Sequence, residues 1–157
     1  EIVSRDWSSD VCSSDLDILT YAGAQDTVLI HDAARPCLSE ALITACIGAL
    51  DGHDGVLPVL PMKDTVYLSR DGKCVSSLLN RQEIFAGQAP ELFVLGKYYE
   101  ANEQLLPQKI LQVNGSTEPA VLAGMDIAMI PGDEGNYKIT TKVDLERFRE
   151  YISQKRL

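Results

Sequence analysis

A short strand-like run that ends in charged residues constrains this chain more than any other feature of its sequence. The run from Thr27 to Ile30 has no polar interruption, and this pattern is typical of a strand buried on both faces of a parallel sheet. His31 and Asp32 end the run, and Arg35 follows after two alanines. Because ligands of open α/β sheets bind beyond the carboxyl ends of the strands, this stretch predicts a ligand site directly after its strand.

The residue types in this stretch suit a metal ion together with a phosphate group. Asp32 supplies hard oxygen ligands for Mg²⁺, and the planar guanidinium of Arg35 fits two phosphate oxygens at once. Ala33 and Ala34 are small, so a ligand can approach the backbone closely. In the alternative interpretation, Asp32 only caps a turn and Arg35 only pairs with it. Spacing alone leaves both interpretations open.

Composition argues against several classes of protein. The chain has 157 residues, of which 45% are hydrophobic and 24% charged, so we expect one domain with its own core. A net charge of −9 argues against general binding to nucleic acid or to anionic membranes, and no apolar run reaches the roughly 20 residues of a membrane helix. The 4 cysteines form no C-x-x-C pair and there are only 2 histidines, which argues against zinc and indicates reduced thiols in a cytoplasmic protein.

Strand-like and helix-like segments alternate along the chain and predict an α/β fold. Ser39 predicts the N-cap of a helix. Spacing places the apolar face of this helix at Leu42, Ile43, Cys46, Ile47 and Leu50. Gly55 to Pro61 predicts a strand in which Pro58 marks an edge or an irregular position. The turn residues 70–73 predict a hairpin, which must lie on the domain or on a partner chain because a lone hairpin is unstable.

The second half of the chain continues the alternation. We expect a helix within 95–106, a strand or loop at 109–113, a helix from Ser116 to Gly124 and a strand at 126–130. Lys138 stands in a short strand-like run that leads into a last helix. Thr141 and Asp144 have the spacing of a capping box for that helix. Its core face is expected at Leu145, Phe148 and Ile152.

Residues 1–16 do not resemble native protein sequence. The segment from Asp6 to Asp15 is similar to one reading frame of a common sequencing-library adapter. We therefore predict that 1–16 is an artefact and exclude it from the fold. A polar N-terminal extension is the alternative, whereas a signal peptide would need an apolar region that this segment lacks.

The run His-Asp-Ala-Ala-Arg-Pro at 31–36, placed after an apolar strand, resembles the signature of the 2-C-methyl-D-erythritol 4-phosphate cytidylyltransferase family. Ribitol-5-phosphate cytidylyltransferases share much the same pattern. Asn-Tyr-Lys-Ile-Thr at 136–140 matches the family's Asn-Ile-Lys-Ile-Thr. The resemblance implies a Rossmann-like nucleotidyltransferase sheet, of which 17–157 would be the C-terminal portion of a single domain. It also implies a β-arm at about 61–86 that embraces the second subunit of a homodimer.

The resemblance also implies a reaction. A cytidylyl group would pass from CTP to a polyol phosphate and pyrophosphate would leave, which needs positioning and charge neutralisation rather than a nucleophilic side chain. Asp32 would bind Mg²⁺ and orient the triphosphate. Arg35 would contact phosphate, and Lys138 would neutralise developing phosphate charge.

The remaining substrate contacts implied by the resemblance come from two places. Ala33 and Ala34 would line the substrate site beside the metal-binding carboxylate. Thr65 and Arg81 would reach the polyol phosphate of the other subunit from the arm. For the arm residues, ordinary exposed positions in a hairpin are the alternative.

Three departures from the family pattern bear on activity. Ala89-Pro90-Glu91 stands where the family usually carries Thr-Pro-Gln, so a hydroxyl is lost and a negative charge is expected to alter phosphate contacts. Gly135 stands where an acidic residue often precedes the asparagine. The family's glycine-rich nucleotide loop has no counterpart before Asp32, so we expect the chain by itself to be inactive. A ribitol-phosphate enzyme and a non-catalytic nucleotide-binding or dimerisation domain remain the alternatives.

Overall fold

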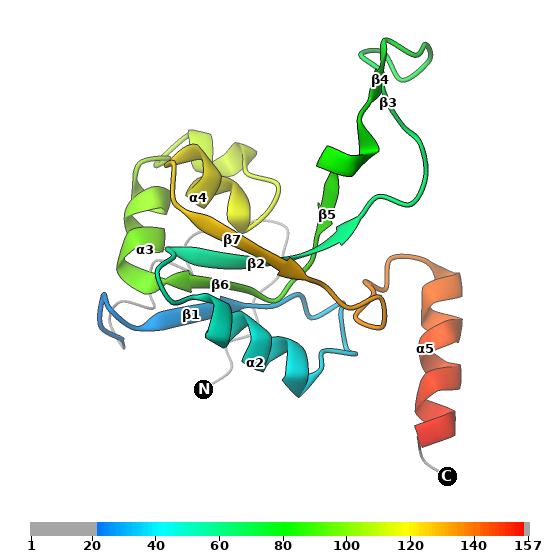
Figure 1. The fold of residues 1–157 in the computed structure, drawn as a ribbon, viewed down its shortest axis with the longest axis horizontal. Helices are drawn as coiled ribbons and strands as arrows, with labels where there is room; N and C mark the ends of the chain where they lie inside the picture. The colour runs from blue at the N-terminus through cyan, green and yellow to red at the C-terminus, as the bar shows by residue number, and fades with distance from the viewer. Residues whose placement is uncertain (1–21, 156–157) are drawn as a thin grey trace.

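A five-stranded mixed sheet forms the centre of the computed structural model, which describes residues 22–155 (Figure 1). β2 is its central strand: it pairs in parallel with β7 on one side and antiparallel with β6 and then β5 on the other. β6 pairs antiparallel with β1. The strands are β1, Thr27–Ile30; β2, Gly55–Pro61; β5, Phe85–Gly87; β6, Glu91–Val94; and β7, Ile127–Pro131. The predicted artefact at 1–16 lies outside the described residues.

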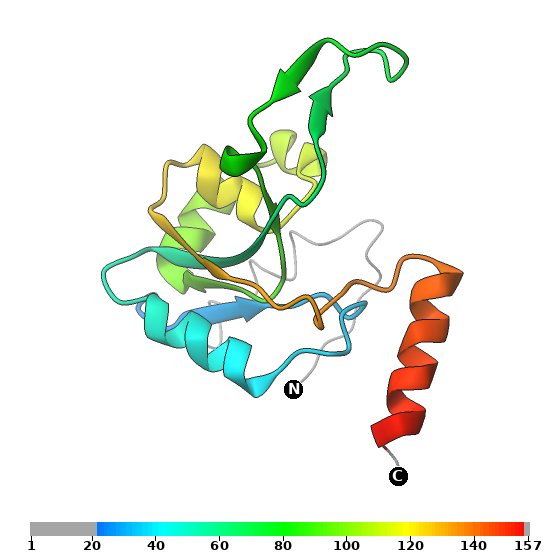
Figure 2. The same cartoon turned by 45° about the vertical axis from the view of Figure 1, so that its right-hand side comes forward.

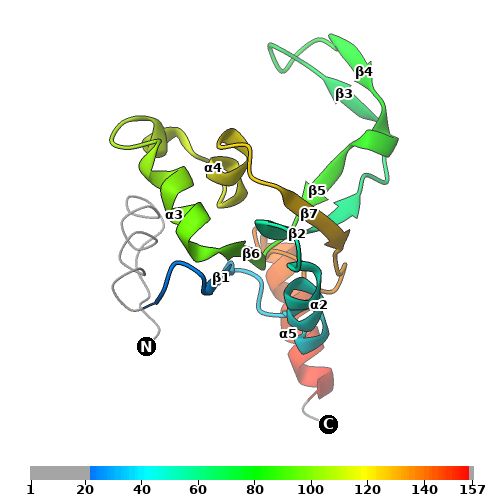
Figure 3. The ribbon, with the colours of Figure 1, turned by 60° about the vertical axis from the view of Figure 1, so that its left-hand side comes forward.

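Helices cover both faces of this sheet. α2 contacts β2, β6 and β7 on one face, and α3 packs against α4 and β6 on the other (Figures 1 and 3). The helices are α2, Glu40–Ala49; α3, Leu95–Glu103; α4, Thr117–Leu122; and α5, Lys142–Lys155; short 3₁₀ helices are η2, Arg81–Glu83, and η3, Lys109–Gln112. Within residues 22–155, none of these helices combines the length and the apolar character that crossing a membrane requires.

Alternation along the strands divides the apolar side chains between two cores. On the face under α2, Cys46, Val56 and Leu92 are buried together. On the opposite face Phe93 stacks on Tyr98 with ring centroids 4.4 Å apart. Neighbouring residues of β6 thus serve different cores, and β1 follows the same rule because its residues also pack into both.

The expectation that β1 belongs to a parallel sheet is wrong. After the arm, the chain returns through β5 and β6 alongside β2, so an antiparallel strand separates β1 from β2. β1 lies at the end of the described sheet, and its residues are half-buried or exposed rather than fully buried. Pro58 lies in the central strand, not at an edge. It occupies an irregular position there, between the part of β2 that pairs with β6 and the part that pairs with β5.

The predicted hairpin is confirmed as β3, Val66–Leu68, paired with β4, Ser77–Leu79. It projects from the sheet beyond the ends of β2 and β5 (Figure 2). Its apolar side chains have little cover within one chain: Tyr67, Leu68, Val75 and Leu78 are all exposed. The arm therefore presents an apolar surface without a partner in this chain.

The helix predictions are confirmed in position and partly wrong in burial. Ser39 caps α2 by accepting a hydrogen bond from the Leu42 amide at 3.2 Å, but Ile47 points to solvent. The predicted strand or loop at 109–113 is the 3₁₀ helix η3. In α5 the capping box forms, since the Thr141 amide donates to Asp144 Oδ2 at 2.8 Å and the Asp144 amide to Thr141 Oγ1 at 3.2 Å. The expected core face of α5 is wrong, because no residue of 142–155 is buried.

Charged side chains join the first turn of α3 to the loops that precede β2 and β7. Lys97 forms an ion pair with Asp54, and Asp54 Oδ2 accepts a hydrogen bond from the Asp126 amide at 3.0 Å. His53 contacts Asp126 at 2.9 Å. The hydrogen bond from Lys97 is the main reason that the pKa of Asp54 lies below its ordinary value.

Candidate functional site

Three segments reach one edge of the sheet because three strands end there. β1 and β2 are both antiparallel to β6, so they run in the same direction, and β7 is parallel to β2. The loop 31–35 follows β1, the arm follows β2, and the loop 132–141 follows β7. Residues far apart in sequence are thereby brought to the carboxyl edge, where α/β sheets bind ligands.

Two cations meet one carboxylate at this edge. Lys138 Nζ lies 3.0 Å from Asp32 Oδ2, and Arg35 Nε lies 3.4 Å from the same oxygen. The Asp32 side chain is 15% exposed and that of Arg35 is 13% exposed, whereas that of Lys138 is 44% exposed. In the alternative interpretation, Asp32 only caps a turn and Arg35 only pairs with it. That interpretation explains the contact between these two residues but not the contact of Lys138, which comes from the loop after β7. The cluster thus places a half-exposed ammonium beside two largely buried charges.

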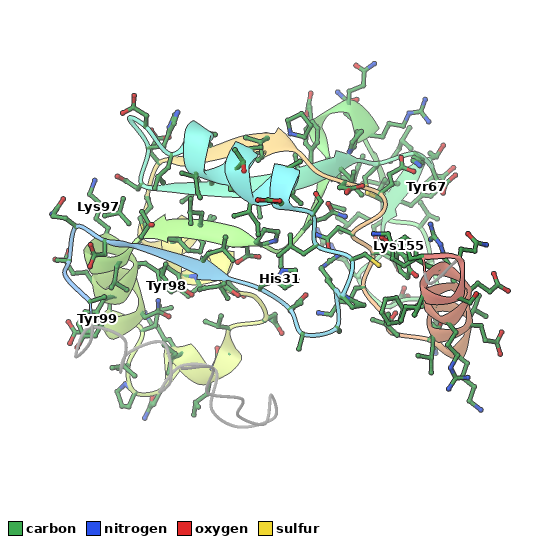
Figure 4. The ribbon with its side chains drawn as sticks, turned by 90° about the horizontal axis from the view of Figure 1, so that it is seen from below. His31, Tyr67, Lys97, Tyr98, Tyr99 and Lys155 are labelled. Atoms are coloured by element: carbon green, nitrogen blue, oxygen red, sulfur yellow. The ribbon has the colours of Figure 1, made fainter. Side chains whose placement is uncertain are left out.

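The turn after β1 is held by its own hydrogen bonds. His31 Nε2 lies 2.8 Å from the carbonyl oxygen of Arg35, and because a carbonyl only accepts, Nε2 carries the proton and donates. The Arg35 amide donates to the Asp32 carbonyl at 2.9 Å. His31 lies at the end of β1 in Figure 4, and its Nδ1 is buried without a hydrogen-bond partner. Ala33 is exposed, whereas Ala34 is half-buried and accepts a hydrogen bond from the Ile139 amide at 2.8 Å.

Lys138 stands in a loop, so the strand-like run predicted around it is wrong. A buried polar side chain holds this loop: Asn136 is fully buried, and its Nδ2 donates to the Ala89 carbonyl at 2.7 Å. The Asn136 carbonyl in turn accepts a hydrogen bond from Arg35 Nη1 at 2.8 Å. The loop is therefore tied both to the turn after β1 and to the segment between β5 and β6.

Gln88 is a second buried polar residue whose contacts sequence reasoning missed. It is 4% exposed. Its Nε2 donates to the Asp133 carbonyl at 3.0 Å, and its Oε1 accepts from the Asp133 amide at 2.9 Å. These bonds join residues 45 positions apart, so nothing in local spacing indicates them. A glutamine between two apolar strands was the one available signal.

Glu91, the departure noted in the sequence, lies near this cluster and is largely shielded from solvent. Burial is the largest cause that raises the pKa of Glu91, the Ser116 and Thr117 side chains partly offset this, and the Asp32 charge adds to it. Glu91 Oε2 and Thr117 Oγ1 are buried without a well-formed hydrogen bond. The repulsion between Glu91 and a phosphate stays a prediction. Burial favours the neutral acid, and a neutral Glu91 would repel a phosphate less than a carboxylate would.

Thr65 and Arg81 lie on the arm. They line one groove together with Leu78, Leu79 and Asn80. Arg81 Nη1 donates to the Lys63 carbonyl at 2.8 Å. The groove includes none of the three charged residues of the cluster. Within one chain, the arm residues and the cluster are thus two separate sites.

Asp32 has the oxygen chemistry of a magnesium ligand. Within residues 22–155, no group of three or more His, Cys, Asp or Glu side chains converges closely enough to hold a metal ion. Both cations contact Oδ2 of Asp32. The other carboxylate oxygen, Oδ1, is also a hard donor of the kind that Mg²⁺ prefers. Mg²⁺ is commonly held by one or two carboxylates with substrate phosphates and water, and the residues present fit that arrangement.

The chain is similar to known proteins over most of its length. Residues 9–154 match the family model "IspD: 2-C-methyl-D-erythritol 4-phosphate cytidylyltransferase". The 2-C-methyl-D-erythritol 4-phosphate cytidylyltransferase of Roseobacter denitrificans is 34% identical over 125 residues, which cover 80% of this chain and 54% of that protein. The bifunctional enzyme IspD/IspF of Paramagnetospirillum magneticum is 37% identical over 124 residues, covering 79% and 31%.

The fold also matches solved structures. The crystal structure of 4-diphosphocytidyl-2C-methyl-D-erythritol synthase from Anaerococcus prevotii aligns with a TM-score of 0.80 at 27% identity, over 93% of this chain and 65% of that one. The chain thus spans about half the length, or less, of the curated relatives described above. The family match begins at residue 9 and overlaps the segment 1–16, whose assignment as an artefact stays a prediction.

Proposed function

This chain belongs to the 2-C-methyl-D-erythritol 4-phosphate cytidylyltransferase family, and from that premise we propose that its complete protein transfers a cytidylyl group from CTP to 2-C-methyl-D-erythritol 4-phosphate. The oxygen of the substrate phosphate attacks the α-phosphorus of CTP, the bond to the β-phosphate oxygen breaks, and pyrophosphate leaves. The product would enter the synthesis of isoprenoid precursors. The observation that carries the proposal is the meeting of Lys138 and Arg35 at one oxygen of Asp32.

The charges of the cluster suit this reaction. Lys138, the most exposed of the three, would contact phosphate oxygens and neutralise the charge that develops on them. Arg35, held by the Asn136 carbonyl, would present its guanidinium to phosphate. Ala33, exposed between the charged residues, would let the substrate approach the backbone.

Mg²⁺ is the cofactor that we propose, with Asp32 as its protein ligand. When bound, the ion would neutralise phosphate charge and hold the triphosphate in place. The two cations on Oδ2 orient the Asp32 carboxylate before any metal arrives. We place the enzyme in the cytoplasm, because Cys37, Cys46 and Cys74 are unpaired thiols.

The arm supports a homodimer. Its exposed apolar side chains need cover, and Thr65 and Arg81 lie apart from the cluster in their own chain. We propose that the arm embraces a second subunit and that these two residues reach the polyol phosphate bound there.

Turnover by the complete protein tests the function. We expect pyrophosphate release with CTP, Mg²⁺ and 2-C-methyl-D-erythritol 4-phosphate, and a loss of about 100-fold or more in kcat for Asp32→Asn and Lys138→Met with folding intact. Asp51→Asn, in the exposed turn after α2, is the matched control for the aspartate change. Unchanged turnover in Asp32→Asn would refute the catalytic role.

The same assay separates the alternatives. Faster turnover with ribitol 5-phosphate would assign the other substrate, and CTP binding without turnover would indicate a non-catalytic domain. We propose that residues 1–157 alone do not turn over, because no glycine-rich triphosphate loop precedes Asp32 in this sequence. Substantial pyrophosphate release by this chain would contradict that.

A further inference from the structure

Three neutral polar side chains of the described residues are nearly inaccessible to solvent: Gln88, Asn102 and Asn136. Asn102 bonds within α3, to the Tyr98 carbonyl, whereas the other two connect separate segments. Gln88 is 4% exposed and Asn136 is 0% exposed. Burying an amide costs free energy unless hydrogen bonds replace its contacts with water. The bonds that these two amides make therefore show which segments they hold together.

Gln88 joins the root of the arm to the loop after β7. It directly follows β5, the strand on which the chain returns from the arm, and its own amide donates to the Pro58 carbonyl of β2 at 2.8 Å. Its side chain both donates to and accepts from the backbone of Asp133, at 3.0 and 2.9 Å. A pair of bonds to one residue fixes the orientation of the loop as well as its distance.

Asn136 makes the complementary connection. It reaches from the loop back to the Ala89 carbonyl, at 2.7 Å, so two neighbouring residues of the arm's return hold two residues of the loop. The Asn136 carbonyl accepts from Arg35 Nη1 at 2.8 Å. The connection thus continues into the charged cluster, and Lys138 stands two residues further along the chain.

The backbone segments around Gln88 are closely packed. A Cβ at Gly132 would contact Gln88 Oε1 and lie 3.1 Å from the Val59 carbonyl, so only glycine lets the loop approach this closely. A second tie is exposed: Lys63, at the start of the arm, pairs with Glu134 at 2.6 Å. Because exposed ion pairs contribute little, we assign the fixed placement mainly to the buried amides.

We infer that Gln88 and Asn136 are positioning residues that hold the Lys138 loop against the root of the arm and thereby keep Lys138 beside Asp32. The expected effect on turnover rests on the proposed function, whereas the placement of Lys138 by these two residues does not. If a partner subunit moved the arm, the return strand β5 and Gln88 after it would move too. Gln88 would then shift the loop after β7 and with it Lys138.

The test measures the accessibility of Lys138 in residues 1–157. Brief acetylation with isotope-labelled acetic anhydride, followed by peptide mass spectrometry, reports each lysine, and the exposed Lys73 and Lys109 are internal references. In Gln88→Glu a carboxylate replaces the donating amide and faces the Asp133 carbonyl. The matched control is Gln104→Glu, the same change at an exposed position.

We expect Gln88→Glu to raise the labelling of Lys138 relative to the references about fivefold, the scale of one lost hydrogen bond, and Asn136→Asp to act in the same direction. The control should leave the ratio unchanged. An unchanged ratio in folded Gln88→Glu overturns the inference. If that variant does not fold, Gln88→Met, which keeps the size without the charge, is judged by the same ratio.

Kinetics of the complete protein add the catalytic consequence. We expect Gln88→Glu to lower kcat about tenfold while the KM for CTP changes less, because Asp32, on the other loop, would still orient the triphosphate. Absence of turnover in the unsubstituted complete protein would refute the proposed function and leave the labelling ratio to decide the positioning role. A loss confined to the denaturation midpoint, with kcat and the ratio unchanged, would show a merely structural role.

Discussion

A methyl group added at the start of the central strand should destabilise the chain. Gly55 lies in register with Phe93 of β6. An ideal Cβ at Gly55 would stand 2.6 Å from Phe93 Cδ1, 2.8 Å from Ile127 Cδ1 and 3.0 Å from the Leu92 carbonyl oxygen. Ordinary carbon contacts lie at about 3.5–4.0 Å, so the overlap is roughly 1 Å with each of the two side-chain carbons and a few tenths of an ångström with the oxygen.

The neighbours of Gly55 cannot move cheaply. Phe93 is fully buried and stacked on Tyr98, and the Leu92 oxygen belongs to the backbone. Overpacking of this kind costs about 1–3 kcal/mol, and the lower entropy of the unfolded alanine chain returns only about 0.4–1 kcal/mol. We therefore expect Gly55→Ala to lower the free energy of unfolding by about 1–2 kcal/mol.

Urea denaturation followed by circular dichroism measures this loss. With a dependence of about 1–3 kcal/mol per molar urea, the midpoint should fall by roughly 0.5–1 M. Gly48→Ala is the matched control: Gly48 lies in α2 with no atom within 4 Å of its added Cβ. There the same change should stabilise by about 0.5–1 kcal/mol. A midpoint for Gly55→Ala at or above that of the unsubstituted chain would refute this account of the packing.

Three further changes test the electrostatics and the capping. The pKa of Asp54 is lowered chiefly by Lys97, so its stabilising contribution is present at neutral pH and lost as the pH falls below about 4; Asp54→Asn should flatten the acid dependence of the urea midpoint. Burial raises the pKa of Glu91, so the stability of the chain should fall as the pH rises above the ordinary glutamate range; Glu91→Gln should raise the midpoint at pH 7, and a gap that does not shrink toward pH 4 would contradict this. Because Asp144 accepts from the Thr141 amide at 2.8 Å, Asp144→Ala should speed hydrogen exchange in the first turn of α5, and unchanged exchange there would count against the capping role.

Local patterns were sufficient to predict most elements, and the resemblance was needed for the charged cluster. The run 27–30, the capping residue Ser39 and the turn residues 70–73 are fixed by interactions within a few residues, and the structure confirms the strand, the helix and the hairpin. The proximity of Lys138 to Asp32 followed from the resemblance together with the rule that ligand-binding loops follow strands.

Burial and strand direction could not be predicted in the same way, because both depend on distant segments. Ile47 continues the apolar spacing of α2 but is 60% exposed, and Leu145 belongs to α5, in which no residue is buried. The antiparallel β6 depends on where the arm returns. The buried amides of Gln88 and Asn136 bond to backbone atoms 45 and 47 positions away, for which the sequence carries no periodic signal.

The position of α5 has a mechanical consequence. The helix begins only four residues after Lys138, and it is held from the side by surface contacts such as the guanidinium of Arg147 over the ring of Tyr137, 4.2 Å from its centroid. Figure 4 places Lys155, on its last turn, at the other end of the molecule from Lys97. A fused domain or an immobilisation tag attached after Lys155 could pull on α5. Because no residue of α5 is buried, this force would act on Lys138 without first disrupting a packed core.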